Sequence, residues 1–224
     1  MPRSKADVTL RRMIVEHFSV APLGCNCVIL GDEDRGEALV IDPGGESERI
    51  LARLDALGLR CVGIVHTHTH FDHVGATHLM QQGTGAPTML HEADLPLYQG
   101  MQMQLDAFGI PMRAPDAVDI DRFLVEGDTV RAGNVEAGVL HTPGHTPGSP
   151  SFTVEGDRPV LIAGDTLFQH SIGRTDLWGG SAQDILKSIK TKLLDLPEET
   201  LVITGHGPVT TVGEERRLNP FLAR

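Results

Sequence analysis

The sequence predicts an α/β (α+β) protein in which two β-sheets pack together and helices cover their outer faces. Short runs of apolar and β-branched residues recur in both halves of the chain, and each half passes from strands into a helix with one apolar face. No linker rich in Pro, Gly or Ser divides the 224 residues. We therefore expect one domain over residues 1–224, long enough to bury a sizeable core.

The first half contains short apolar runs that predict strands and two segments that predict helices. The strands are expected at Met13–Val20, Cys27–Leu30, Ala38–Ile41, Cys61–Val65 and Thr88–Leu90. Glu46–Leu57 carries apolar residues at helical spacing, and Gly58 ends it. A second helix is expected after Asp72, through about Gln82.

The segment from Glu92 to Asp119 is less regular and leaves two interpretations open. It contains MQMQLDAFGIPM, in which methionines alternate and Gly109 and Pro111 interrupt any helix. One interpretation is a flexible cover. The other is a helix packed into the core, because Met at helical spacing usually fills core space.

The second half predicts further strands and then a helix. The strands are expected at Phe123–Val125, Thr129–Val130, Val135–Leu140, Ser151–Val154, Val160–Ile162 and Leu201–Ile203. Ser181 followed by Asp184 is a capping box, and the apolar residues from Ile185 to Leu193 give the following helix one apolar face. Pro220 limits any final helix.

Composition and charge exclude several kinds of partner. The chain has 19 Lys and Arg against 30 Asp and Glu, a net charge of −11, which repels nucleic acid and anionic lipid. The three cysteines, Cys25, Cys27 and Cys61, suggest no disulfide framework. The basic N-terminal residues are not followed by an apolar stretch, so no signal peptide is expected, and no apolar run is long enough to span a membrane. A cytoplasmic protein is therefore expected.

The stretch Val65–Gly75, VHTHTHFDHVG, places four histidines and one aspartate directly after an apolar run. Neutral imidazole is the commonest metal ligand near neutral pH. His68 and His70 are two residues apart and can point the same way in an extended segment, whereas Asp72 and His73 follow at a turn and can aim at a neighbouring point. The pattern HxHxDH therefore favours two metal ions held by one loop.

Two ions need more ligands than this loop supplies, and three distant residues qualify. His145 lies in HTPGHTPGS, Asp165 follows the apolar run LIAG, and His206 lies between two glycines in TGHGP. Each is expected near the end of a strand, where binding sites of α/β proteins gather. A carboxylate such as that of Asp165 has two oxygens and can bridge two cations. Asp42, in LVIDPGG, is either a partner for a ligand imidazole or a turn residue before Pro43.

The motifs HTHFDH, GHTPGS, GDTLF and GHGP occur in this order, and the chain resembles the metallo-β-lactamase superfamily over nearly its whole length. The resemblance implies a four-layer αββα sandwich. It also implies two divalent metal ions, expected to be zinc, with iron or manganese as alternatives. Carried over by motif, the first ion is held by His68, His70 and His145, the second by Asp72, His73 and His206, and both by Asp165.

Paired cations lower the pKa of a shared water from about 15.7 towards about 7, which supplies a hydroxide nucleophile without a nucleophilic side chain. Asp72 is a ligand that can also orient this hydroxide, which makes it the candidate catalytic residue. The predicted reaction is hydrolysis of an activated acyl carbonyl. The expected partner is a small-molecule acyl thioester or ester, with no nucleic acid or membrane, and a homodimer is compatible with the sequence.

Within the superfamily, the chain is most similar to short hydroxyacylglutathione hydrolases of the glyoxalase II type, on the segments GRTD and GHGPVTTVGEERRLNPFL. It lacks the C-terminal helical domain of longer members. Arg174 is a candidate substrate contact or an ion-pair partner of Asp176, and His170 is a candidate pocket residue. Two alternatives stay open: a persulfide dioxygenase with one iron on His68, His145 and Asp165, or a lactonase of the same fold.

Overall fold

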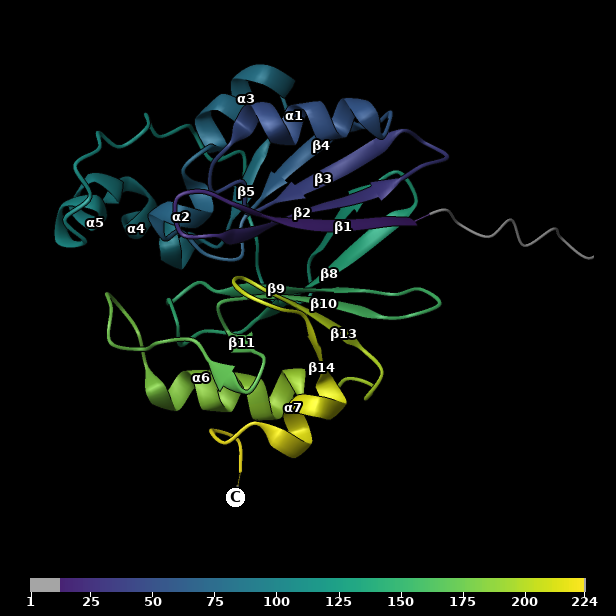
Figure 1. Cartoon of the computed structure of the whole chain (residues 1–224), viewed down its shortest axis with the longest axis vertical. Helices are drawn as coiled ribbons and strands as arrows, with labels where there is room; N and C mark the ends of the chain where they lie inside the picture. The colour runs from purple at the N-terminus through teal and green to yellow at the C-terminus, as the bar shows by residue number, and fades with distance from the viewer. Residues whose placement is uncertain (1–12, 224) are drawn as a thin grey trace, which may run out of the picture.

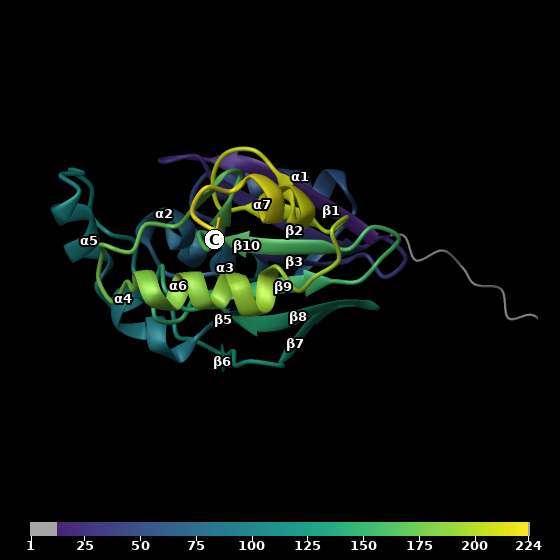
Figure 2. The ribbon, with the colours of Figure 1, turned by 90° about the horizontal axis from the view of Figure 1, so that it is seen from below.

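The computed structural model describes residues 13–223 and arranges them in four layers, with two six-stranded sheets packed between helices (Figure 1). Helices α1 (Ser47–Ala56) and α3 (Thr77–Thr84) cover the outer face of the first sheet. Helices α6 (Ala182–Ser188) and α7 (Val212–Leu218) cover the second, as the view from below shows (Figure 2). The predicted fold class, two sheets between layers of helices, is confirmed.

The first sheet contains six strands in sequence order. These are β1 (Met13–Val20), β2 (Cys25–Asp32), β3 (Glu37–Ile41), β4 (Arg60–Val65), β5 (Thr88–Leu90) and β6 (Arg122–Phe123). Strands β1 to β3 pair antiparallel, whereas β3 to β6 pair parallel. The carboxyl ends of β3, β4 and β5 therefore meet at one edge, where the loop with the clustered histidines begins.

The second sheet has the order β14 (Thr210–Thr211), β13 (Leu201–Thr204), β10 (Val160–Gly164), β9 (Pro150–Val154), β8 (Val135–His141) and β7 (Thr129–Ala132). Strand β10 is parallel to β13, and both β8 and β10 are antiparallel to β9. Strands β8, β10 and β13 therefore run in the same direction, and the loops that carry His145, Asp165 and His206 leave the sheet at a common edge.

Three apolar layers hold the sandwich together. Residues such as Leu30, Leu39 and Phe152 fill the space between the sheets. Ile50 of α1 packs on the outer face of the first sheet, and Ile185 of α6 packs on the second. Strand β2 is buried along its whole length, which explains why it reads as a continuous apolar run rather than an alternating one. Each fully buried aliphatic side chain contributes about 1.5–3 kcal/mol.

The helix predicted from Asp72 to about Gln82 is two helices, and this expectation was wrong. Helix α2 (Phe71–Val74) is capped by Gly75, and α3 begins at Thr77. The Ala76 N–H donates to the Pro43 carbonyl at 2.9 Å instead of continuing the helix. A Cβ on Gly75 would lie 2.4 Å from the Gly44 carbonyl oxygen, so close packing against the loop after β3 fixes the break.

The segment from Glu92 is helical as far as Ala107, and the core-packing interpretation holds for Met101, whereas Met103 and Met112 are exposed. It forms a 3₁₀ turn (Glu92–Asp94), α4 (Leu95–Gln99) and α5 (Met101–Ala107). Leu97, Tyr98, Met101 and Leu105 are buried, and the last three pack with Phe71 of α2. The chain is irregular from Gly109 to Asp121.

Several short elements were not predicted. The hairpin β11 (Leu167–Phe168) and β12 (Ser171–Ile172), together with β14, are two residues per strand, too short for a periodic pattern. Helix α7 ends at Leu218, before Pro220, and a five-residue π-helix at Ile189–Leu193 extends α6. Every helix within residues 13–223 is too short or too polar to span a lipid bilayer.

Candidate metal centre

Hydrogen bonds to Asp42 hold the start of the loop that follows β4. Asp42, at the end of β3, accepts hydrogen bonds from the Thr67 N–H at 2.7 Å and the Thr67 hydroxyl at 2.5 Å. The four residues from Thr67 to His70 that follow β4 are all buried. The parallel pairing of β3 and β4 places Asp42 beside this loop, so the strand register sets where the histidines start.

His68 and His70 converge with His145 from the second sheet. One ligand atom of each lies within 4.8 Å of the others. The His70 Nδ1 and His145 Nε2 atoms are 2.9 Å apart. Among the described residues, His68 Nε2 has no hydrogen-bond partner although it is buried. Buried polar atoms are normally paired, so this convergence of imidazole nitrogens is the arrangement that a cation would satisfy.

These three histidines are held in the neutral form. Burial lowers the pKa of each, well below the usual value for His68 and to about 3 for His70. Neighbouring imidazoles add to the shift, and the Arg174 charge contributes at His70. Neutral imidazole is the form that coordinates a metal, so no proton has to be displaced from these rings when an ion binds.

Asp72, His73 and His206 form a second group next to the first. The His73 and His206 Nε2 atoms are 3.1 Å apart, and Asp72 Oδ2 lies 3.2 Å from His206 Nε2. Burial alone would raise the pKa of Asp72, but the charges of His73 and His206 and a hydrogen bond from His206 lower it to about 2. Asp72 is therefore ionised next to His73 and His206, and although burial lowers the pKa of both imidazoles, the neighbouring carboxylates raise it above the usual value. A metal ion at this group would displace protons from these two rings.

Asp165 lies between the two groups. Its carboxylate oxygens are 3.6 Å from His145 Nε2, 3.5 Å from His73 Nε2 and 3.8 Å from His206 Nε2. A Cβ at Gly205 would lie 2.0 Å from Asp165 Oδ1, so the glycine leaves room for the carboxylate. The structure thus brings together all seven residues that the motifs single out.

The donor set fits divalent cations. It consists of imidazole nitrogens and carboxylate oxygens, which suit zinc, iron and manganese. His68 Nε2 and Asp165 Oδ1 are buried without a hydrogen-bond partner in the described part of the chain, although they belong to different sheets. Unpaired buried polar atoms are costly, and bound cations would pair them. The clusters are consistent with metal binding.

Outer contacts orient the ligand rings. Asp42 Oδ2 is 3.0 Å from His73 Nδ1, so the interpretation of Asp42 as an imidazole partner is supported. His145 Nδ1 donates to the Arg174 carbonyl at 2.8 Å, and Thr67 Oγ1 lies 3.2 Å from His68 Nδ1. Asn26 Nδ2 donates to the carbonyls of Thr204 and Gly207 and so fixes the loop around His206. Neither Asn26 nor the Arg174 carbonyl could be predicted from the sequence, because neither belongs to a recognisable motif.

The remaining histidines lie outside these groups. His66 is buried, and its Nε2 is 3.1 Å from the Thr77 hydroxyl, as expected for a structural residue. His141 Nε2 donates to the Pro147 carbonyl at 2.9 Å, within the loop that carries His145. His170 pairs with Glu214 at 2.9 Å.

The candidate substrate contact Arg174 is bound to a neighbour. Its guanidinium donates to both carboxylate oxygens of Asp176, at 2.7 Å and 2.8 Å, at the protein surface. The ion pair that the sequence left open is therefore present. The Arg174 charge also contributes to lowering the pKa of His70, after burial and the neighbouring imidazoles.

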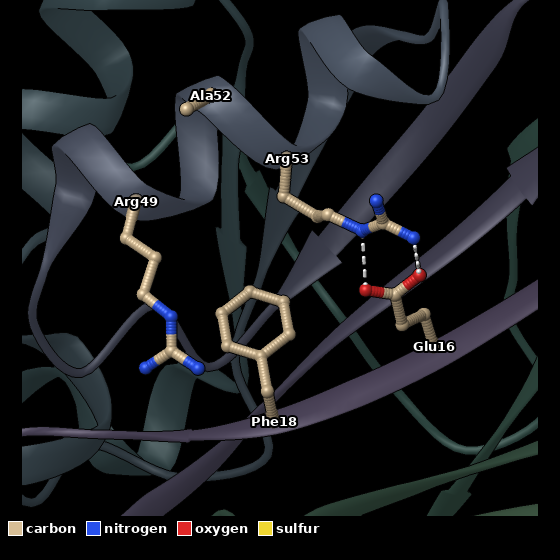
Figure 3. A pocket seen from close by; sticks show the side chains of 5 residues that line it. All are labelled: Glu16, Phe18, Arg49, Ala52 and Arg53. Atoms are coloured by element: carbon tan, nitrogen blue, oxygen red, sulfur yellow. Dashed lines mark hydrogen bonds and ion pairs between the residues drawn. The ribbon is translucent and has the colours of Figure 1, made fainter.

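A surface hollow between β1 and α1 carries two further guanidinium groups (Figure 3). Arg53 donates to both oxygens of Glu16, at 2.5 Å and 2.6 Å, and Arg49 lies 4.7 Å over the Phe18 ring. Both cations are engaged with protein groups and none of the predicted ligands lines the hollow. These contacts join α1 to β1, and the hollow is not part of the candidate metal centre.

Comparison with known proteins places this arrangement in a family. A model described as the metallo-beta-lactamase superfamily matches residues 20–206. The chain belongs to the metallo-β-lactamase superfamily, and the resemblance seen in the motifs is confirmed. Its fold and its His and Asp clusters are those of a metallo-hydrolase of this superfamily.

Three relatives illustrate the range of the similarity. The hydroxyacylglutathione hydrolase GloC of Haemophilus influenzae is 40% identical over 212 residues, covering 94% of this chain and 98% of its own. The crystal structure of TTHA1623 in a di-iron-bound form is 39% identical, with a TM-score of 0.82 over 93% of this chain and all of that one. The B3 metallo-beta-lactamase BLEG-1 is 37% identical, with a TM-score of 0.83 over 94% and 100%.

Proposed function

We propose that this protein is a binuclear metallo-hydrolase that cleaves an activated acyl carbonyl, with a glutathione thioester as the substrate class. The observation that carries the proposal is the position of Asp165, within 3.8 Å of ligand nitrogens from both groups. A single mononuclear site would need only one of these groups. The second group is complete, with Asp72 and His73 buried and His206 partly buried, which favours a pair of ions.

The residues divide the work between holding metals and orienting the reaction. His68, His70 and His145 would hold one ion, whereas Asp72, His73 and His206 would hold the other, with Asp165 between them. When bound, such ions polarise an acyl carbonyl and lower the pKa of water to about 7. The low pKa of Asp72 keeps it ionised, so it can accept a hydrogen bond and orient a water molecule toward the carbonyl carbon.

The thioester substrate class is supported by the relative from Haemophilus influenzae, whose name is hydroxyacylglutathione hydrolase. A thioester carbonyl is more reactive than an amide, so a centre that supplies an oxygen nucleophile needs no protein acyl intermediate. Arg174 is the proposed contact for an anionic part of such a substrate, because its guanidinium is exposed and its backbone carbonyl is bound to His145. His170 is a second, weaker candidate for a substrate contact, since its ring is already paired with Glu214.

The test combines metal content with hydrolysis of lactoylglutathione. Zinc-loaded protein should contain about two ions per chain and hydrolyse the thioester. His206→Ala should reduce kcat/KM by at least about a hundredfold by removing a second-group ligand, whereas His17→Ala, on the exposed part of β1, should leave it unchanged. One iron per chain with oxygen uptake on glutathione persulfide would contradict the proposal and favour a dioxygenase.

Hydrolysis of a β-lactam is the second candidate, and the similarity to BLEG-1 favours it. The same arrangement of ligands could direct water at a strained amide carbonyl. A side-by-side measurement of kcat/KM for lactoylglutathione, a lactone and a β-lactam, each with zinc-loaded and iron-loaded protein, separates these substrate classes. The iron arm is included because the TTHA1623 structure holds two iron ions.

A further inference from the structure

Asp94 is a buried carboxylate outside the ligand set, and it touches both ligand loops. It ends the 3₁₀ turn that follows β5 and is 1% exposed. Its backbone carbonyl accepts a hydrogen bond from the Thr69 hydroxyl at 2.9 Å. Thr69 stands between His68 and His70, so this contact fixes the first ligand loop at its centre.

The Asp94 side chain binds the other ligand loop. Oδ1 accepts the Gly148 N–H at 2.6 Å, and Oδ2 accepts the Thr146 hydroxyl at 2.8 Å. Thr146 follows His145 directly. A Cβ on Gly148 would lie 2.6 Å from the Asp94 Cγ, so the loop approaches the carboxylate as closely as a glycine permits. One residue thus joins a loop of the first sheet to a loop of the second.

We propose that Asp94 is a positioning residue that holds the His70 and His145 loops at the spacing needed for the first metal ion. The inference rests on the proposed function, because it assumes that these histidines bind an ion. Asp94 itself touches none of the seven candidate ligands: its bonds go to the hydroxyls and amides of neighbouring residues.

The surroundings of Asp94 disfavour its charged form. Burial raises the pKa of this carboxyl to about 6, although the bonds from Thr146 and Gly148 lower it. The ionised form is therefore disfavoured by the fold. An uncharged Asn in its place therefore avoids the unfavourable burial of a charge at neutral pH.

Asp32 is a matched control, a buried carboxylate whose pKa is shifted in the other direction. It is also buried, and it accepts the Asn134 N–H at 2.7 Å, so it too joins the two halves of the chain. Burial alone would raise its pKa, but hydrogen bonds from Asn134 and Arg35 lower it. Asp32 ends β2, whose first residue, Cys25, contacts His73, so Asp32 lies at the far end of that strand from the metal centre.

The experiment compares Asp94→Asn with Asp32→Asn in the full chain. Zinc dissociation constants are measured by competition with a chromophoric chelator, and unfolding of the metal-free protein is measured with urea. Asp94→Asn should weaken one of the two zinc sites about tenfold, the lower end of the range for outer partners of metal ligands, without lowering metal-free stability at neutral pH. Asp32→Asn should lower stability and leave both zinc constants unchanged.

Thr146→Val tests the same contact from the other loop. If Asp94 acts through Thr146, the double variant should bind zinc about as weakly as the worse of the two single variants. Wild-type zinc binding in Asp94→Asn would overturn the inference and leave the metal centre standing. A wild-type chain that binds no zinc would overturn the proposed function, and the inference with it.

Discussion

At the level of single residues, main-chain atoms share in orienting the metal ligands. The Arg174 carbonyl accepts from His145, and the Thr67 N–H donates to the Asp42 carboxylate that also contacts His73. The clustering of the candidate ligands was predictable, because His and Asp at fixed spacing are rare and their chemistry is specific. The carbonyl contact was not, since every residue carries the same carbonyl and only the folded backbone selects one.

Asp94 should make the stability of the metal-free protein depend on pH in a defined direction. A carboxyl whose pKa is raised by folding, here from 3.8 to about 6, binds its proton more tightly in the folded state. Its contribution is therefore fully present below the unfolded pKa and is lost as the pH rises through the folded pKa. Relative to Asp94→Asn, wild type should lose about 2–3 kcal/mol between pH about 4 and about 7.

Urea unfolding of both proteins across this pH range measures the difference directly. Other titrating groups are common to the two proteins and cancel. A difference between the two unfolding free energies that stays constant with pH would show that Asp94 titrates as it does in the unfolded chain.

Asp42 gives a second prediction at this level. Its φ of 53° lies in the left-handed region, which Asn tolerates well, so Asp42→Asn keeps the backbone while removing the charge beside His73. We expect the second metal site to bind zinc about 10–100-fold more weakly. Chelator competition gives the constants. An effect confined to the first site would contradict the assignment of His73 to the second group.

At the level of elements, helix α5 is fastened to the ligand loop by one buried amide. Gln104 Nε2 donates to the carbonyls of Thr69 and Leu97, at 3.1 Å and 2.8 Å, and its Oε1 accepts the Phe71 N–H at 3.1 Å. Gln104 is fully buried. The helix was uncertain from sequence, because its apolar pattern is short and its decisive contact is made by a polar residue.

Gln104→Leu should therefore destabilise the protein strongly. The substitution leaves the Thr69 carbonyl and the Phe71 N–H without their partner, at about 1–3 kcal/mol for each unsatisfied group, whereas the Leu97 carbonyl still accepts the Gly100 N–H. Urea unfolding provides the measurement. Gln102→Leu, on the exposed side of the same helix, is the control, because water can replace the hydrogen bonds that Gln102 makes at the surface. Equal losses in both variants would show that the buried amide is not what fastens the helix.

Helices with several turns were better predicted than the short elements. The α6 start was correct, since the Ser181 hydroxyl accepts the Asp184 N–H as the capping box requires. The break after Val74 was missed because it depends on the Pro43 carbonyl, which lies far away in the sequence. Tertiary contacts of this kind do not alter the periodic pattern of apolar residues from which helices are predicted.

At the level of the whole molecule, the candidate metal ligands come from both sheets. His68, His70, Asp72 and His73 follow β4, whereas His145, Asp165 and His206 follow β8, β10 and β13. The order of strands and helices predicted the layers. The convergence of these loops at one edge came from the motifs, because strand order within a sheet cannot be read from an apolar pattern.

Because the ligands come from both halves, metal binding should stabilise the entire fold. A ligand that binds only the folded state adds about 2.7 kcal/mol when its free concentration is a hundredfold above its dissociation constant. We expect the midpoint of thermal unfolding to rise with buffered free zinc and to fall on chelation. His206→Ala should reduce the rise. A midpoint independent of zinc in wild type would contradict the assignment of the seven residues as ligands.

The hydrogen bond between His145 and the backbone of residue 174 makes the anchoring of the imidazole independent of the side-chain charge at position 174. The imidazole depends on a backbone oxygen, whereas the guanidinium of the same residue points to the surface and pairs with Asp176. A different amino acid at this position would change the charge that an incoming molecule meets, yet it would leave the imidazole anchored. Variation at position 174 can therefore alter the local surface charge without disturbing the imidazole of His145.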